Sequence, residues 1–130
     1  MTVQLNHTIV HADDREASAR FFAEVFGRPE PVPFGPFLVV ELDNGVSLDF
    51  AAVGDGREVT AQHYAFLVGE DDFDAIYGRI VARGLNHYPG PSLDHEGEIN
   101  HNDGGRGVYW VGPEGHFYEI LTVPYGGWPS

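Results

Sequence analysis

Three residues carry the donor atoms that a catalytic divalent metal needs. His7 follows Val3 and Leu5 in an alternating run, so its imidazole shares the apolar face of a predicted strand. Glu119 shares a similar face, where an unpaired carboxylate is costly to bury. With His63 they supply two imidazoles and one carboxylate, a ligand set that leaves positions open for substrate. Each histidine alone could be an ordinary strand residue, but the two occupy matching positions in a repeated pattern.

Further side chains could assist such a metal. Asp49 follows a turn glycine by four residues, as Glu119 does, and could be a fourth ligand, an outer-shell base or an exposed aspartate. His101 and Tyr109 could supply a proton donor and an orienting hydroxyl, or be a solvated loop histidine and a core tyrosine. Five aromatic residues could line an apolar cavity, although individually such residues are more often plain core. They are Phe34, Phe37, Tyr64, Trp110 and Tyr125.

The elements that must position these residues occur twice along the chain. In each half, a strand pattern is followed by a capped helix and then by further strands. The first half places them at residues 3–10, 13–26, 37–42 and 46–53. The second half places them at residues 63–68, 71–83, 107–111 and 116–123. We therefore predict an α+β fold of two β-α-β-β-β modules, about residues 1–55 and 61–125, in one domain spanning 1–130.

Residues 86–106 are the main difference between the two halves. Glycine and proline recur along this segment, which excludes a long helix, and it contains His87, His95 and His101. A surface loop is the simplest interpretation, yet a loop this long in a small domain is often functional. We expect it to fold over the mouth of the cavity, with His101 near the metal and Tyr109 beside it.

Composition excludes several classes of function. The chain has 7 basic residues, all arginine, against 20 acidic ones, and its formal net charge of −13 argues against nucleic acid and anionic membranes as partners. Cysteine is absent, which excludes disulfides, thiolate nucleophiles and iron–sulfur ligation. No stretch approaches the roughly 20 apolar residues of a membrane span, and we expect no secretory signal. We expect a cytoplasmic protein that binds a small molecule.

The pattern resembles the vicinal oxygen chelate superfamily, which includes glyoxalase I, extradiol ring-cleaving dioxygenases, fosfomycin-resistance enzymes and bleomycin-binding proteins. The resemblance covers essentially the whole chain. It rests on the paired modules, on His7 and His63 in their first strands, and on Gly115-His-Phe-Tyr-Glu119 in the last strand. It implies two curved sheets that form an incomplete barrel around a metal held by His7, His63 and Glu119. It also implies Fe²⁺, Mn²⁺, Ni²⁺ or Zn²⁺ as the metal, and a homodimer.

One stretch carries a narrower resemblance. The run from Ile99-Asn-His101 through Val108-Tyr109 and Gly112-Pro113-Glu114-Gly115 to Glu119 resembles the signature of type I extradiol dioxygenases. There the histidine and tyrosine contact substrate or oxygen and the glutamate binds the metal, which implies these roles for His101, Tyr109 and Glu119. The signature usually has an acidic or small polar residue where this chain has Gly112.

We therefore predict a metal-dependent enzyme that chelates two adjacent oxygens of a small organic substrate, most like the extradiol dioxygenase branch. Two alternatives stay open. One is a glyoxalase- or lyase-type isomerisation that uses Asp49, and the other is non-enzymatic sequestration of a small molecule or antibiotic, as in bleomycin resistance. A pure binding protein has no need of a metal with open positions, so the ligand set favours an enzyme.

Overall fold

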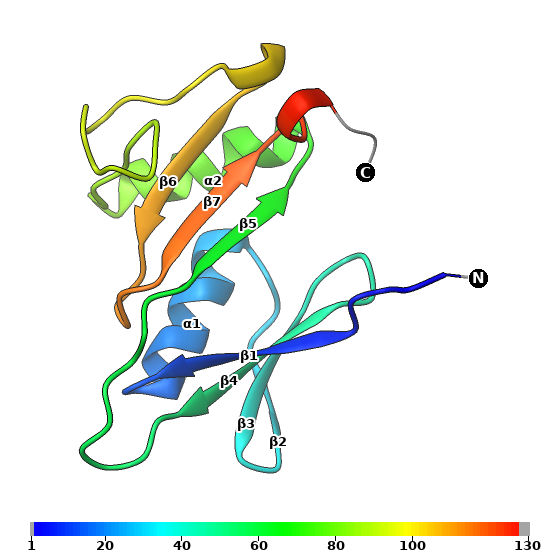
Figure 1. Ribbon diagram of the computed structural model, residues 1–130, viewed down its shortest axis with the longest axis vertical. Coiled ribbons are helices and arrows are strands. Elements are labelled where there is room, and N and C mark those ends of the chain that lie inside the picture. The colour runs from blue at the N-terminus through cyan, green and yellow to red at the C-terminus, as the bar shows by residue number, and fades with distance from the viewer. Residues whose placement is uncertain (1, 128–130) are drawn as a thin grey trace. The chain divides into compact units, whose positions relative to one another are not determined.

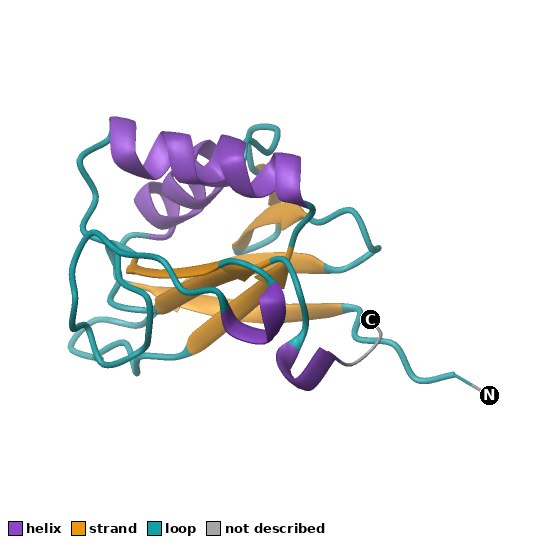
Figure 2. Ribbon diagram, turned by 90° about the horizontal axis from the view of Figure 1, so that it is seen from above, coloured by secondary structure: helices purple, strands orange, loops and turns teal. Residues whose placement is uncertain are grey.

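The computed structural model describes residues 2–127, and the chain divides into two compact units, Met1–Thr60 and Ala61–Ser130 (Figure 1). Each unit combines one mixed sheet with one long helix, which confirms the predicted α+β class. In each unit the helix covers one face of the sheet (Figure 2). None of the described helices is long and apolar enough to cross a membrane.

The first unit contains a four-stranded sheet in the order β1-β4-β3-β2. Its elements are β1 (His7–Ala12), α1 (Arg15–Phe26), β2 (Val32–Phe34), β3 (Phe37–Glu41) and β4 (Ser47–Ala52). Strand β1 runs parallel to β4, and the other pairs are antiparallel. Helix α1 begins where the Asp14 side chain accepts a hydrogen bond from the Ala17 amide at 3.0 Å, and it ends at Gly27 in the left-handed region.

The second unit contains a three-stranded sheet in the order β5-β7-β6. Its elements are β5 (His63–Leu67), α2 (Glu70–Ala82), β6 (Gly107–Val111), β7 (Phe117–Leu121) and the short 3₁₀ turns η1 (Asn102–Gly104) and η2 (Tyr125–Gly127). Where the first module has β2, the segment 86–106 makes only the single bridges Tyr88–Tyr109 and Asn100–Gly107. Its prolines and glycines interrupt a continuous ladder, so the second module has one strand fewer than predicted.

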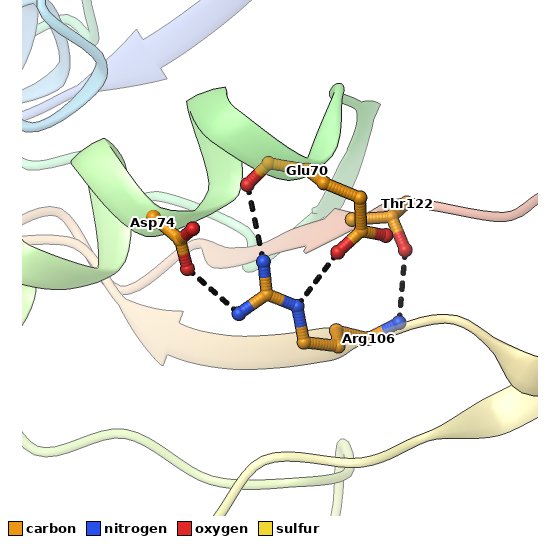
Figure 3. A network of polar contacts seen from close by, with 4 residues as sticks. All are labelled: Glu70, Asp74, Arg106 and Thr122. Carbon is orange, nitrogen blue, oxygen red and sulfur yellow. Dashed lines mark hydrogen bonds and ion pairs between the residues drawn. The ribbon is translucent and has the colours of Figure 1, made fainter.

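Arg106, the last residue of the segment 86–106, forms hydrogen bonds and ion pairs with helix α2 (Figure 3). Its Nε donates to Glu70 Oε1 and its Nη1 donates to Asp74 Oδ1, both at 2.8 Å. The guanidinium also lies 4.3 Å from the centre of the Phe73 ring. The Thr122 hydroxyl and then Arg106 lower the pKa of Glu70. This link therefore contributes stability at neutral pH that is lost as the pH falls from the ordinary carboxyl range through the lowered pKa.

Gly112, at the start of the β6–β7 turn, is required by close packing. A Cβ atom there would fall on the Glu114 carboxylate and lie 2.6 Å from Cε2 of the buried Tyr118 ring. We expect Gly112→Ala to lower the free energy of unfolding by about 1–3 kcal/mol, as overpacking does. Gly78 in α2 is the matched control: a Cβ there meets nothing within 4 Å, so Gly78→Ala should stabilise by about 0.5–1 kcal/mol. Urea unfolding measures both, and wild-type stability in Gly112→Ala would contradict the packing argument.

Candidate functional site

His63 and Glu119 meet on one face of the second sheet. Strand β5 pairs in parallel with β7 so that Ala65 lies opposite Glu119, and His63 stands two residues before Ala65 on the same face. His63 Nε2 lies 2.9 Å from Glu119 Oε1. The Glu119 side chain is only 1% exposed, whereas that of His63 is 44% exposed. A buried carboxylate thus faces an imidazole that solvent reaches.

The spacing of these two donor atoms fits a shared metal ion. Two atoms that bind one ion at about 2.1 Å and at right angles to each other lie about 3.0 Å apart. An imidazole nitrogen and a carboxylate oxygen at 2.9 Å match that geometry, and they form a hydrogen bond when no ion separates them. Among residues 2–127, no three His, Cys, Asp or Glu side chains form a group that could hold an ion. His63 and Glu119, which belong to one unit, are the two predicted ligands whose contact the structure describes.

Two tyrosine hydroxyls complete the surroundings of Glu119. The Tyr125 hydroxyl donates to Glu119 Oε2, and the Tyr109 hydroxyl lies 2.6 Å from that of Tyr125. Because Tyr125 has one proton and gives it to the carboxylate, Tyr109 must donate to Tyr125. The Tyr109 ring centre lies 5.6 Å from that of His63. Burial above all raises the pKa of Tyr109 and of Tyr125, so both phenols stay protonated at neutral pH.

The first unit presents a corresponding pair on its own sheet. His7 pairs with Ser47, and Ile9 pairs with Asp49. Asp49 therefore lies opposite the residue two places after His7, just as Glu119 lies opposite the residue two places after His63. This register confirms the equivalence between Asp49 and Glu119 predicted from the sequence. The His7 Nδ1 lies 2.8 Å from Asn6 Oδ1, and the Ser47 hydroxyl donates to Asp49 Oδ1 at 2.8 Å. The roles of His7 and Asp49 as ligands stay predictions.

His101 is exposed and directly precedes η1. The end of its segment is held beside η2, because the Gly126 amide donates to Asp103 Oδ2 at 3.1 Å. Tyr125, whose hydroxyl donates to Glu119, also belongs to η2. The segment therefore lies beside the turn whose Tyr125 contacts Glu119. The catalytic role of His101 stays a prediction.

The predicted cavity-lining aromatic residues divide between different environments. Trp110 is buried and stacks on Tyr118 with ring centres 6.0 Å apart, and Tyr64 stacks on the same ring at 5.9 Å. Strand alternation puts both on the opposite face from Glu119, where Trp110 is buried and Tyr64 is half-buried. Phe34 is exposed in β2, and Phe37 is half-buried in β3. Tyr125 lies beside Glu119.

The sequence offers no positional argument for His116 and favours a surface side chain, which is wrong, because His116 is buried with 1% exposure. Its Nδ1 accepts a hydrogen bond from the Gln62 amide at 2.9 Å, which leaves the ring proton on Nε2 in the neutral form. Strand alternation is the signal that could have indicated its burial, because His116 lies on the same strand face as the apolar Ile120. Its bond to the chain just before β5 points to a structural role.

Comparisons with known proteins identify the family. No family model matches the chain. The solved structure of the oxidase ChaP-H1 is 62% identical, with a TM-score of 0.91, and the match covers 97% of this chain and 100% of that one. The oxidase ChaP-H2 is 56% identical, with a TM-score of 0.93, over 98% and 100% of the two chains. The metallothiol transferase FosB of Lysinibacillus sphaericus (strain C3-41) is 28% identical, over 94% of this chain and 84% of FosB.

A more distant structure extends the same relationship. The glyoxalase/dioxygenase from Nostoc punctiforme is 22% identical with a TM-score of 0.69, over 93% and 91% of the two chains, and it shares the fold. The chain belongs to the vicinal oxygen chelate superfamily. This confirms the resemblance drawn from the paired modules. His63 and Glu119, which are in contact, occupy two of the three positions that the resemblance implies as metal ligands, and that role stays a prediction.

Proposed function

We propose that the chain is a metal-dependent oxidising enzyme of the vicinal oxygen chelate superfamily that chelates two adjacent oxygens of a small organic substrate. The observation that carries the proposal is the 2.9 Å approach of His63 Nε2 to the buried Glu119 Oε1. Support for oxidation comes from the similarity to ChaP-H1 and ChaP-H2, both of which are named oxidases. Support for a catalytic metal comes from the donor types, which suit Fe²⁺, Mn²⁺, Ni²⁺ or Zn²⁺.

Different residues of the protein would hold the metal and supply protons. His63 and Glu119 would hold the ion, and His7 would be the third ligand, supplied by the same chain or by a second copy in a homodimer. A bound divalent ion supplies Lewis acidity and, if it is iron, redox chemistry with O₂. The Tyr109 and Tyr125 hydroxyls present protons beside Glu119. His101 would serve as the general acid or base for the substrate.

The first unit exposes large apolar side chains at both edges of its sheet, which a second copy of the chain would cover. Val3 and Leu5, just before edge strand β1, and Phe34, in the other edge strand β2, expose 96%, 66% and 72% of their area, so apolar surface of this unit meets water. Burial against a second copy would remove it from water. We therefore keep the homodimer as part of the proposal.

A glyoxalase-type isomerisation is the second candidate function. The observation in its favour is the register that places Asp49 in the first sheet where Glu119 lies in the second. In that reaction Asp49 would be a fourth ligand or the base. It requires no O₂, which separates it from the oxidising enzyme.

Oxygen uptake distinguishes the two candidates. We expect protein loaded anaerobically with Fe²⁺ to consume O₂ when catechols are supplied, and protein loaded with Zn²⁺ not to, because zinc has no redox chemistry. The same preparations would be given 2-oxoaldehyde–thiol adducts. If an adduct is isomerised and no catechol causes O₂ uptake, the oxidising function would be overturned and the second candidate favoured.

A further inference from the structure

The two oxygens of Glu119 have separate partners. Oε1 faces His63 Nε2 at 2.9 Å, whereas Oε2 accepts the proton of the Tyr125 hydroxyl. Because the carboxylate is buried, water does not compete for either oxygen. Oε2 is thus occupied by the hydrogen bond from Tyr125, whereas Oε1 is available to a metal.

Tyr125 is itself held from two sides. From the sheet, the Tyr109 hydroxyl donates to the Tyr125 hydroxyl at 2.6 Å. From the long segment, Asp103 Oδ2 accepts a hydrogen bond from the Gly126 amide at 3.1 Å. Tyr125 lies beyond the last strand, in a short 3₁₀ turn, so these contacts fix a ring that no ladder positions.

We propose that Tyr125 is a positioning residue that restrains Glu119 to bind the metal through Oε1 alone, and that Asp103 holds the η2 turn for this purpose. The inference rests on the proposed function, since it needs a metal at His63 and Glu119. Partners of this kind fix the orientation of a ligand. A carboxylate that gives one oxygen instead of two also leaves one more coordination position for a substrate that brings two oxygens of its own.

Cobalt binding tests the inference without any substrate. The variant Tyr125→Phe keeps the ring and removes the hydroxyl, and we expect its affinity for Co²⁺ to fall by roughly 10–100-fold, as for other residues that support ligands. The visible spectrum of bound Co²⁺ should also change, because the freed Oε2 can then bind. The matched control is Tyr77→Phe, which removes a hydroxyl bonded to His87 Nε2 at 3.0 Å and should alter neither quantity.

Asp103→Ala tests the second part of the inference. Alone, it should weaken Co²⁺ binding by a smaller factor than Tyr125→Phe. In the Tyr125→Phe background it should have no further effect, because it acts through the tyrosine. A full additional loss in the double variant would overturn the role of Asp103.

The outcomes separate this inference from the metal site on which it rests. Wild-type affinity and an unchanged Co²⁺ spectrum in Tyr125→Phe would overturn the inference while leaving the site intact, provided Glu119→Gln loses Co²⁺. Wild-type protein that binds Co²⁺ no better than Glu119→Gln would overturn the metal site, and the inference with it. Unfolding curves for each variant establish that a loss of binding is not a loss of fold.

Discussion

Glu119→Gln is expected to lose its metal and, with it, the oxidising activity. The substitution keeps the shape of the side chain but replaces a charged ligand by a neutral amide. Loss of an outer-shell partner alone costs roughly 10–100-fold in metal affinity, and loss of a ligand should cost at least as much. Metal content after desalting and the rate of O₂ uptake measure the two effects.

Glu114→Gln is the matched control for this prediction. Glu114 is a second buried carboxylate on the same hairpin, and its Oε2 accepts a hydrogen bond from the His116 amide rather than facing His63. We expect this variant to keep its metal. Equal metal content in Glu119→Gln and wild type would show that Glu119 is not a ligand.

His101→Ala should lower turnover by about 10²–10⁴, the usual contribution of a general acid or base, while the metal stays bound. The expectation follows from the dioxygenase-like spacing between His101 and Glu119 and from the attachment of its segment to the η2 turn. Metal analysis and steady-state rates with saturating substrate are the measurements.

His95→Ala provides the comparison. His95 belongs to the same exposed segment, and its Nδ1 lies 3.8 Å from Glu98 Oε2, so it reports the effect of losing a solvated histidine. Its turnover should equal that of wild type. If His101→Ala behaves in the same way, His101 is a solvated loop residue and the proton donor must be sought among the tyrosines.

Strand alternation was enough to predict much of this structure. The repeated spacing matched Asp49 to Glu119, and the strand register places each of them opposite the residue two places after the histidine of its own module. Turn glycines and an aspartate cap marked α1 and the hairpins because their local geometry needs those residues. Alternation also puts Trp110 on the other face, where it proves to be core.

The rest depends on contacts between segments distant in sequence. Tyr125 follows the last strand in a turn without periodicity, so nothing local predicts that its hydroxyl meets Glu119. The single bridges at Tyr88 and Asn100 likewise depend on how a glycine- and proline-rich segment lies across β6. Local propensity does not encode such pairings.

The crystal structure of the metal-loaded protein, with anomalous scattering recorded at the absorption edge of the metal, tests the central claim most directly. We predict one ion bound by His63 Nε2 and Glu119 Oε1, each at about 2.0–2.3 Å, with a His7 imidazole as the third protein ligand. The Tyr125 hydroxyl should remain on Glu119 Oε2. An ion bound elsewhere, or a His63–Glu119 hydrogen bond that persists at saturating metal, would contradict the account.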